Sequence, residues 1–256
     1  DFRVGDSLSP RRLRANDLAL LAAMNIPKVT VTRRPVVALV STGDELVMPG
    51  EDPSPDQIIA SNGFALKAMV EAAGGEARLL PIARDNMAEL ETVLDLADGA
   101  DLVVTIGGAS VGDHDLVGQV SGLERVFWKI AVRPGKPLIA GRLRGVPMLG
   151  LPGNPVSAIV CGHLFVLPML RAMLGDPSPA PRTQKARLAV DVAENGPRTH
   201  YMRARLQSGD GMPGIAPYDR QDSALLSILG QADALLIRPV GDGPRRAGEI
   251  VDYLPL

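Results

Sequence analysis

The sequence contains few aromatic residues, one cysteine and no excess of positive charge. Phe, Trp and Tyr make up 3% of the 256 residues, and Cys161 alone cannot form an internal disulfide framework, which suits a reducing compartment. The 27 Lys and Arg residues are balanced by 29 Asp and Glu residues, giving a net charge of -2. Such a chain offers no basic field to a nucleic-acid backbone, so we expect no nucleic-acid partner.

Several functional signatures are also missing. The sequence contains neither a phosphate-binding-loop lysine motif nor a dinucleotide fingerprint, which disfavours the NTPase and NAD classes. His114, His163 and His200 do not have the spacing of metal ligands, and one cysteine excludes a cysteine-rich zinc site. No apolar run approaches the roughly 18 residues of a membrane span, and no signal-peptide pattern opens the chain. We expect a cytoplasmic protein without a membrane partner.

Glycine and proline are abundant instead. The 27 glycines and 22 prolines are 49 of the 256 residues, about 19%, whereas their usual combined share is about 12%. Both residues mark turns, and glycine also allows the backbone to approach another group closely. The length fits one large domain or two modest ones at roughly 150 residues per domain.

The residue pattern divides the chain into three parts. Residues 1–34 are interpreted as the remnant of an N-terminal region, because one helix starting at Ser9 and Pro10 and ending near Asn25 cannot form its own core. Residues 35–178 alternate short apolar runs with amphipathic segments, which predicts a three-layer α/β domain with a mostly parallel sheet. After a proline-rich break, residues 179–256 show short β-like runs typical of a small all-β domain.

The elements expected in the α/β domain follow from hydrophobic periodicity. Strands are predicted at 36–40, 77–82 and 102–106, with a β-rich stretch over 126–149. Helices are predicted from Ser61, from Asn86 and over 154–174.

Three glycine-containing turns follow predicted strands, at residues 41–45, 107–115 and 151–157. In an α/β sheet, ligands bind beyond the carboxyl ends of the strands. In the third turn, Asn154 and Pro155 open a long helix whose free N–H groups and dipole attract an anion. The alternative is that this pair only caps the helix.

Acidic and basic residues accompany these turns. Asp113 and Asp115 end the second turn, and Glu45 and Asp85 lie near the same predicted sheet edge. Because these acids would repel a phosphate, the simplest interpretation is that magnesium binds between them and the phosphate. The alternative for the aspartates is that they only cap a helix. Cations for a binding loop, or alternatively for a solvated strand edge, are supplied by Lys129, Arg133 and Lys136.

Nucleophilic catalysis is not indicated. Cys161 falls within an apolar helix and is predicted to belong to the core. Ser41, Ser110 and Ser157 lack a strained nucleophile elbow and a placed histidine, which argues against Ser-His-Asp hydrolysis.

Five motifs together resemble the molybdopterin molybdenumtransferase family, including the corresponding domain of gephyrin. They are Ser-Thr-Gly-Asp-Glu-Leu (41–46), Gly-Gly-Ala-Ser-Val-Gly-Asp-His-Asp (107–115), Phe-Trp-Lys (127–129), Pro-Gly-Lys-Pro (134–137) and Leu-Pro-Gly-Asn-Pro-Val-Ser (151–157). The resemblance implies a molybdopterin-binding domain at 35–178 and a C-terminal β-barrel at 179–256. It also implies that molybdate is inserted into adenylylated molybdopterin (molybdopterin-AMP) with Mg²⁺-dependent release of AMP.

The resemblance also implies roles for individual residues. Asp85 and Asp115 would be essential acids acting through magnesium, with Glu45 in the same pocket. Lys129 and Lys136 would hold phosphate or an oxyanion, and Arg133 stands where relatives often have lysine. The implied anion groove and substrate-binding turns comprise Thr42, Gly43, Asp44, Gly107, Gly108, Ser110, Pro152, Gly153, Asn154, Pro155, Ser157, Arg203 and Ser223.

The family further implies two N-terminal regions, of which residues 1–34 resemble only the closing piece; the chain opens on Asp1 rather than Met. It implies a homodimer when intact, whose cleft is completed by the partner subunit, and a possible molybdopterin adenylyltransferase partner. We therefore expect little turnover from this chain alone. Two alternatives remain open at this point: a molybdopterin adenylyltransferase and a non-catalytic, gephyrin-like scaffold.

Overall fold

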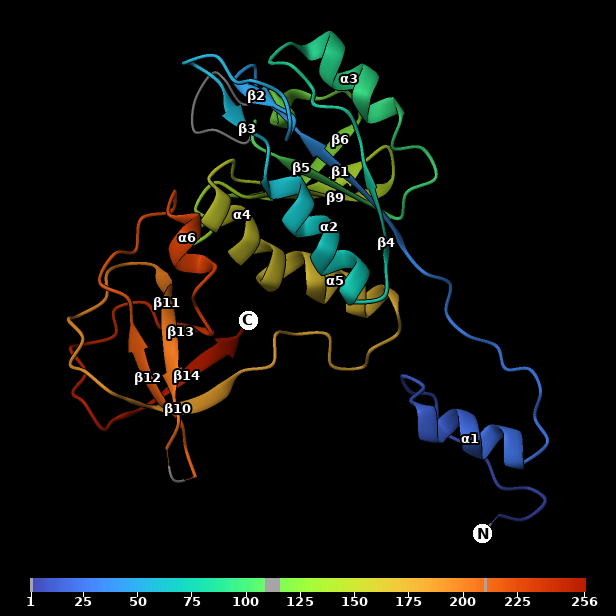
Figure 1. The fold of residues 1–256 in the computed structure, drawn as a ribbon. Coiled ribbons are helices and arrows are strands. Elements are labelled where there is room, and N and C mark those ends of the chain that lie inside the picture. Colours follow the sequence, from blue (N-terminus) through green and yellow to red (C-terminus); the bar gives the residue numbers. More distant parts are fainter. Residues whose placement is uncertain (1, 109–115, 210) are drawn as a thin grey trace.

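The computed structural model describes residues 2–108, 116–209 and 211–256. Figure 1 shows an α/β unit in blue, green and yellow, a β unit in orange and red, and one blue helix set apart from both.

A six-stranded sheet forms the centre of the α/β unit. Its strands lie in the order β4-β1-β5-β9-β8-β6. The first four run parallel, β8 runs in the opposite direction, and β6 runs in the direction of the first four, so the predicted mostly parallel sheet is confirmed. The strands are β1 (Val36–Ser41), β4 (Glu76–Leu79), β5 (Leu102–Ile106), β6 (Leu123–Trp128), β8 (Ile139–Leu143) and β9 (Val146–Leu151).

Helices cover both faces of this sheet (Figure 1). One face packs on α2 (Asn62–Ala72), α4 (Pro155–Cys161) and α5 (Leu167–Met173), and the other on α3 (Met87–Asp95). The residues of β1 alternate between the two cores: Val37 and Leu39 belong to the α2 side, whereas Ala38 and Val40 belong to the α3 side. A strand buried on both faces needs a continuous apolar run, which explains why the sequence predicted three layers correctly.

Local capping fixes some helix boundaries as expected. The Asn86 side chain accepts a hydrogen bond from the Glu89 N–H (2.9 Å), and α3 begins at the next residue. After α2 the chain turns at Gly74, whose φ of 97° is accessible to glycine without strain. The predicted strand at 77–82 ends earlier, at Leu79, shortly before Pro81.

The predicted helix at 154–174 is confirmed as one run, in which a π-helical turn at Gly162–Val166 joins α4 to α5. Contrary to the expectation that no apolar run approaches a membrane span, the helix Pro155–Met173 is long and apolar enough to cross a membrane by length and composition. More than half of it is buried inside the protein, where Ala158, Val166 and Leu170 pack under the sheet. It is therefore a core helix.

The first helix, α1 (Ala15–Ala23), begins later than the predicted start at Ser9 and Pro10. The Asp17 carboxylate accepts the Arg14 backbone N–H (3.0 Å), and hydrogen bonds from Arg14 lower the Asp17 pKa to about 2. This local cap defines the boundary, so Leu13 lies outside the helix.

The β unit closes into a five-stranded barrel, as the family resemblance implied. Its sheet runs β12-β10-β14-β13-β11, and β12 pairs again with β11 to close the ring. The strands are β10 (Gln184–Leu188), β11 (Thr199–Gln207), β12 (Gly214–Pro217), β13 (Ala234–Arg238) and β14 (Ile250–Pro255). The short α6 (Leu226–Leu229) lies between β12 and β13.

The two units are joined at a shared interface. The short strand β7 (Val132–Arg133) leaves the α/β unit and pairs in parallel with β11 of the barrel. The Thr199 N–H donates to the Ala131 carbonyl at 2.9 Å. An apolar cluster fills the joint, with residues from both units: Val132, Val156, Val160, Leu164, Leu229, Leu235 and Leu254.

Candidate functional site

Backbone hydrogen bonds bring the three predicted turns together at the carboxyl edge of the sheet. The Thr42 N–H donates to the Ile106 carbonyl (2.9 Å), and the Gly107 N–H donates to the Leu151 carbonyl (3.0 Å). The Gly43 N–H in turn bonds the Ala83 carbonyl at 3.1 Å, just before Asp85. Four segments that are distant in sequence therefore converge, as expected for the carboxyl ends of neighbouring parallel strands.

Glycine is required where the first two turns touch. Gly107 has a φ of 93°, and a Cβ there would lie 2.6 Å from the Thr42 carbonyl oxygen. Gly108 has a φ of 64°, and its Cβ would lie 2.7 Å from Thr42 Oγ1. Gly153 of the third turn approaches Gly107 as well, with 3.5 Å between its ideal Cβ and the Gly107 Cα. Close backbone approach thus accounts for part of the glycine surplus.

Three of the predicted acids lie side by side. The Asp44 carboxylate accepts the Asp85 backbone N–H at 3.0 Å, and both side chains are exposed. The Glu45 carboxylate folds over Gly43, 2.5 Å from the position of an ideal Cβ. Asp113 and Asp115 of the second turn, together with Ser110, lie outside the described residues.

Sequence reasoning missed Arg84, which fixes the first turn. Its Nη1 donates to the carbonyls of Asp44 (2.9 Å) and Leu46 (3.1 Å). Its position directly before Asp85 suggests an ion pair, whereas the structure directs this donor to backbone carbonyls of the first turn.

The exposed carboxylates of Asp44 and Asp85 fit magnesium better than a metal that requires a full protein cage. Within the described ranges, no group of three or more His, Cys, Asp or Glu side chains is placed to hold a metal ion. Magnesium commonly takes one or two carboxylates, keeps several waters and completes its shell with substrate phosphates.

The segment between β6 and β8 carries Lys129, Arg133 and Lys136 and is called the cationic loop below. It lies at the same sheet edge. Because β6 runs in the direction of β9, its end at Trp128 lies where β9 also ends. The loop returns to β8 through bonds from the Lys129 N–H to Leu138 and from the Ile130 N–H to Lys136. Lys129 has a φ of 65°, and its Nζ lies 3.7 Å from the centre of the Trp128 ring.

These cations are not equivalent. Lys129, Arg133 and Lys136 are all exposed, but Arg133 belongs to β7 and is paired with the barrel through His200. Residues 129–131 lie between β6 and β7, so the three cations do not share one continuous strand.

The predicted free donors at the start of α4 are partly occupied. Pro155 has no N–H, and the Val156 N–H donates to the Ser223 carbonyl of the barrel at 3.1 Å. Asn154 occupies the N-cap position as expected, although its side chain makes no capping hydrogen bond. One of the expected free donors is therefore filled by a chain segment that sequence reasoning could not place, and anion binding at this helix end stays a prediction.

The remaining residues of the third turn are shielded to different degrees. Pro152 and Ser157 are buried, Pro155 is half-buried, and Gly153 and Asn154 are exposed. Asn62 at the start of α2 holds this turn, since its Nδ2 donates to the Gly153 carbonyl at 2.7 Å. Asn62 was not predicted, because its partner lies in another turn.

Arg203 lies behind the barrel loop that carries Ser223. Its side chain is 2% exposed, and its guanidinium donates to the carbonyls of Asp222 (2.8 Å), Leu225 (3.3 Å) and Arg220 (3.4 Å). Desolvation lowers the Arg203 pKa. The structure thus gives Arg203 a role in holding this loop; its contact with an anion stays a prediction.

Two interior groups match the sequence interpretation. Cys161 is fully buried, and burial raises its thiol pKa to about 12, so the predicted core role is confirmed. His200 is also buried, and desolvation, followed by the charge of Arg133, lowers its pKa to about 4. Neither group is poised as a nucleophile or base near neutral pH.

Two buried hydroxyls beneath the second turn lack partners. Thr42 Oγ1 and Thr105 Oγ1 form no hydrogen bond within the part of the chain that the structure describes. Thr105 is 0% exposed, and its hydroxyl lies 3.3 Å from the position of an ideal Cβ on Gly150. A buried hydroxyl without a partner carries an uncompensated desolvation cost.

Replacing Thr105 by valine is therefore expected to raise the free energy of unfolding by about 1 kcal/mol, since valine keeps the shape and removes the hydroxyl. Urea unfolding followed by circular dichroism measures the change. Thr92→Val is the matched control: this exposed threonine donates to the Ala88 carbonyl on α3 at 2.7 Å and gains nothing from the change. A loss of stability in Thr105→Val would show that the hydroxyl is satisfied.

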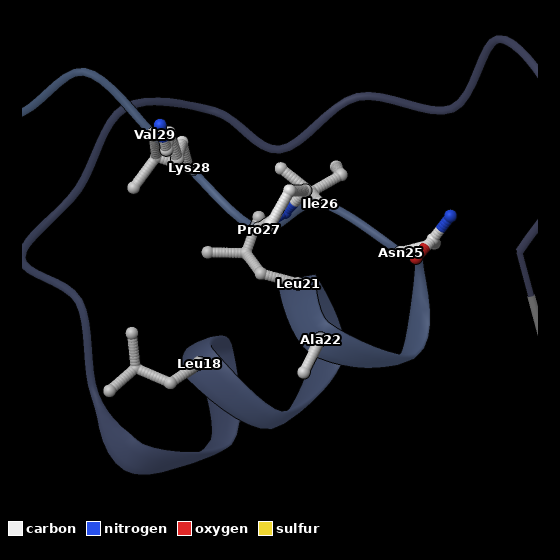
Figure 2. A pocket seen from close by; sticks show the side chains of 8 residues that line it. All are labelled: Leu18, Leu21, Ala22, Asn25, Ile26, Pro27, Lys28 and Val29. Atoms are coloured by element: carbon white, nitrogen blue, oxygen red, sulfur yellow. The ribbon is translucent and has the colours of Figure 1, made fainter.

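Two surface hollows lie away from these turns. One, of about 420 Å³, is formed by α1 and the segment that follows it (Figure 2). Another, of about 330 Å³, is lined in part by the Arg33–Asp101 ion pair. Apart from Lys28, the first is lined by uncharged side chains: Leu18, Leu21, Ala22, Asn25, Ile26, Pro27 and Val29. Neither contains a residue of the predicted site.

Comparison with protein-family models matches both units of the chain. Residues 38–172 match the family described as "Probable molybdopterin binding domain". Residues 185–256 match the "MoeA C-terminal region (domain IV)".

Individual relatives are similar over the whole chain. A molybdopterin molybdenumtransferase of Nostoc sp. is 36% identical over 100% of this chain and 61% of its own length. One from Haemophilus influenzae is 33% identical over 100% of this chain and 65% of its own length. Two solved structures of a molybdopterin biosynthesis MoeA protein from Pyrococcus horikoshii give TM-scores of 0.79 and 0.76 at 33% and 26% identity. They cover 96% and 95% of this chain and 60% of each of their own chains. The chain therefore spans less than two thirds of the length of these relatives.

Proposed function

Because the chain belongs to the MoeA-type molybdopterin molybdenumtransferase family, we propose that it forms the substrate-binding part of such an enzyme. In the proposed reaction, molybdate is inserted into adenylylated molybdopterin and AMP is released. The observation that carries the proposal is the convergence of the three glycine turns, the acids around Asp85 and the cationic loop at one sheet edge.

The residues at this sheet edge would have different roles in substrate binding. Gly107 and Gly108 let the second turn lie directly against Thr42 of the first, and a phosphate group would bind against the backbone of these two turns. Lys136 and Lys129 would neutralise phosphate or molybdate charge, with Arg133 as a third cation. Ser157 and Ser223 would line the groove for the oxyanion, where Ser223 is already tied to the first turn of α4.

Magnesium would be held by Asp85 and, outside the described residues, by Asp115, with Asp44 and Glu45 close to the same place. When bound, it would supply positive charge that offsets the repulsion between these acids and a phosphate. The exposed position of Asp85 leaves room for the waters that magnesium retains.

The barrel favours a transferase over the alternative of an adenylyltransferase. Residues 185–256 match the MoeA C-terminal region, and the barrel would contribute Ser223, whose carbonyl accepts the Val156 N–H, to the rim of the proposed site. We further propose a cytoplasmic location, a homodimer in the intact enzyme and a molybdopterin adenylyltransferase as the source of its substrate.

The proposal is tested by binding tungstate, a heavy analogue of molybdate, in the presence of AMP and Mg²⁺. We expect an anomalous-scattering peak near Ser157 and Ser223 in soaked crystals. We also expect Lys136→Met to weaken the calorimetric affinity about tenfold, the effect of losing one charge-assisted contact worth about 1.4 kcal/mol.

Lys67→Met is the matched control, because Lys67 is a half-buried lysine on α2, away from the predicted site, whose ion pair with Glu71 spans 3.8 Å. An empty groove, or equal affinities for the wild-type and Lys136→Met proteins, would contradict the proposal.

A further inference from the structure

The barrel loop 218–225 is fixed to β11 by one glutamine that uses its whole hydrogen-bonding capacity. The Gln221 Oε1 accepts the Arg203 backbone N–H (3.0 Å) and the Arg203 Nε–H (3.3 Å). Its Nε2 donates to the carbonyls of Arg203 (3.0 Å) and Tyr218 (2.8 Å). A side-chain amide offers two donors and two acceptor sites, so all four are used here.

Arg203 extends these contacts along the loop. Besides Gln221, its buried guanidinium reaches the carbonyls of Arg220, Asp222 and Leu225. A second local bond, from the Ala224 N–H to the Asp222 carboxylate (2.9 Å), turns the chain at the loop tip. We refer to the Gln221 and Arg203 side chains together as the Gln221–Arg203 latch.

The latched loop ends against the α/β unit. The Ser223 carbonyl accepts the Val156 N–H at 3.1 Å, in the first turn of α4 and next to buried Ser157. Apart from β7 and the apolar joint, this bond is a polar contact by which the barrel reaches the candidate site. The position of Ser223 therefore depends on Gln221, two residues earlier, whose side chain is bonded to β11 of the barrel.

We propose that Gln221 is a positioning residue of the oxyanion groove: it sets the loop so that Ser223 closes one side of the groove at α4. Gln221 acts through Ser223 and Arg203 rather than by touching the substrate. That an oxyanion binds in this groove rests on the proposed function. An amide suits this role better than a carboxylate, which retains the acceptors but places negative charge against the Arg203 and Tyr218 carbonyls.

The test uses Gln221→Met, which keeps the length of the side chain and removes all four bonds. We expect at least tenfold faster hydrogen exchange of the Val156 amide and about tenfold weaker tungstate affinity with AMP and Mg²⁺ present. Gln221→Glu keeps the two acceptor contacts and is expected to give a smaller change in both measurements.

Gln231→Met is the matched control, because this exposed barrel glutamine accepts one long bond (3.4 Å) from Arg205. It is expected to leave both readouts unchanged. Protection of the β13 and β14 amides reports whether each variant keeps the barrel folded; if Gln221→Met does not, Gln221→Glu decides the outcome.

The inference is overturned if Val156 exchange is unchanged when the four bonds are lost, or if exchange accelerates while tungstate affinity stays the same. Failure of the wild-type chain to bind tungstate contradicts the proposed function instead. The Val156 exchange rate does not depend on any ligand, so the two failures are distinguishable.

Discussion

Replacement of Gly107 by alanine is expected to destabilise the α/β unit by about 3 kcal/mol and to abolish tungstate binding. Gly107 has a φ of 93°, a conformation that costs an alanine roughly 1–2 kcal/mol. The new Cβ would also meet the Thr42 carbonyl oxygen at 2.6 Å, and overpacking of this kind costs about 1–3 kcal/mol. Relief requires the first and second turns to separate, which opens the candidate site.

Two other glycines provide the controls for this measurement by urea unfolding. Gly241→Ala has a φ of 64° with nothing within 4 Å, so it isolates the conformational cost of about 1 kcal/mol. Gly153→Ala has no positive φ and meets Gly107 Cα at an ordinary 3.5 Å, so we expect a change within about 0.5 kcal/mol. If Gly107→Ala costs no more than Gly241→Ala, the contact with Thr42 is soft and the turns are not locked together.

The architecture was predictable because each element carries its own periodicity. The apolar run from Val36 to Val40 can only be buried on two faces, and the two core clusters divide its residues accordingly. Asn86 and Gly74 mark helix ends by local chemistry that involves neighbouring residues. The start of α1 was misplaced because the pair Ser9 and Pro10 resembles a cap, whereas Asp17 accepts the Arg14 N–H.

The candidate site was predictable only in part, because several of its contacts join distant segments. The alternation of apolar runs with amphipathic segments predicts a parallel sheet, and the turns around Thr42, Gly107 and Gly153 meet because they follow neighbouring strands of that sheet. The bond from the Val156 N–H to Ser223 joins residues of different domains, and no local pattern encodes it. Arg203 shows the same limit: its motif implied an anion contact, while the structure shows its donors directed to loop carbonyls.

A second large effect on the free energy of unfolding is expected in the barrel, from replacement of Asp242. Its Oδ2 accepts the Nε–H of Arg238 (2.6 Å), whose side chain is 2% exposed, and its Oδ1 accepts from Arg245 (2.7 Å). Asp242→Ala would leave the Arg238 charge buried without its anion. Breaking a buried pair in this way typically costs about 3–5 kcal/mol, so we expect about 3 kcal/mol by urea unfolding at pH 7.

The pH dependence gives an independent check. Hydrogen bonds from Arg245 and then Arg238 lower the Asp242 pKa in the folded state. A depressed carboxyl pKa adds stability above the unfolded pKa of about 3.9 and loses it as the pH falls through the folded pKa. The gap in stability between the wild-type and Asp242→Ala proteins should therefore be constant from pH 7 to 5 and shrink below pH 4.

Two further variants separate the buried pair from surface charge. Asp191→Ala removes the partner of Arg246 at a site where both side chains are more than half exposed, so its effect should be far smaller. Arg238→Met combined with Asp242→Ala removes both buried charges and should recover part of the loss. If the double variant is no more stable than Asp242→Ala, the unpaired Arg238 charge costs no more than the bonds that the guanidinium donates to the Ala193 and Gly243 carbonyls contribute.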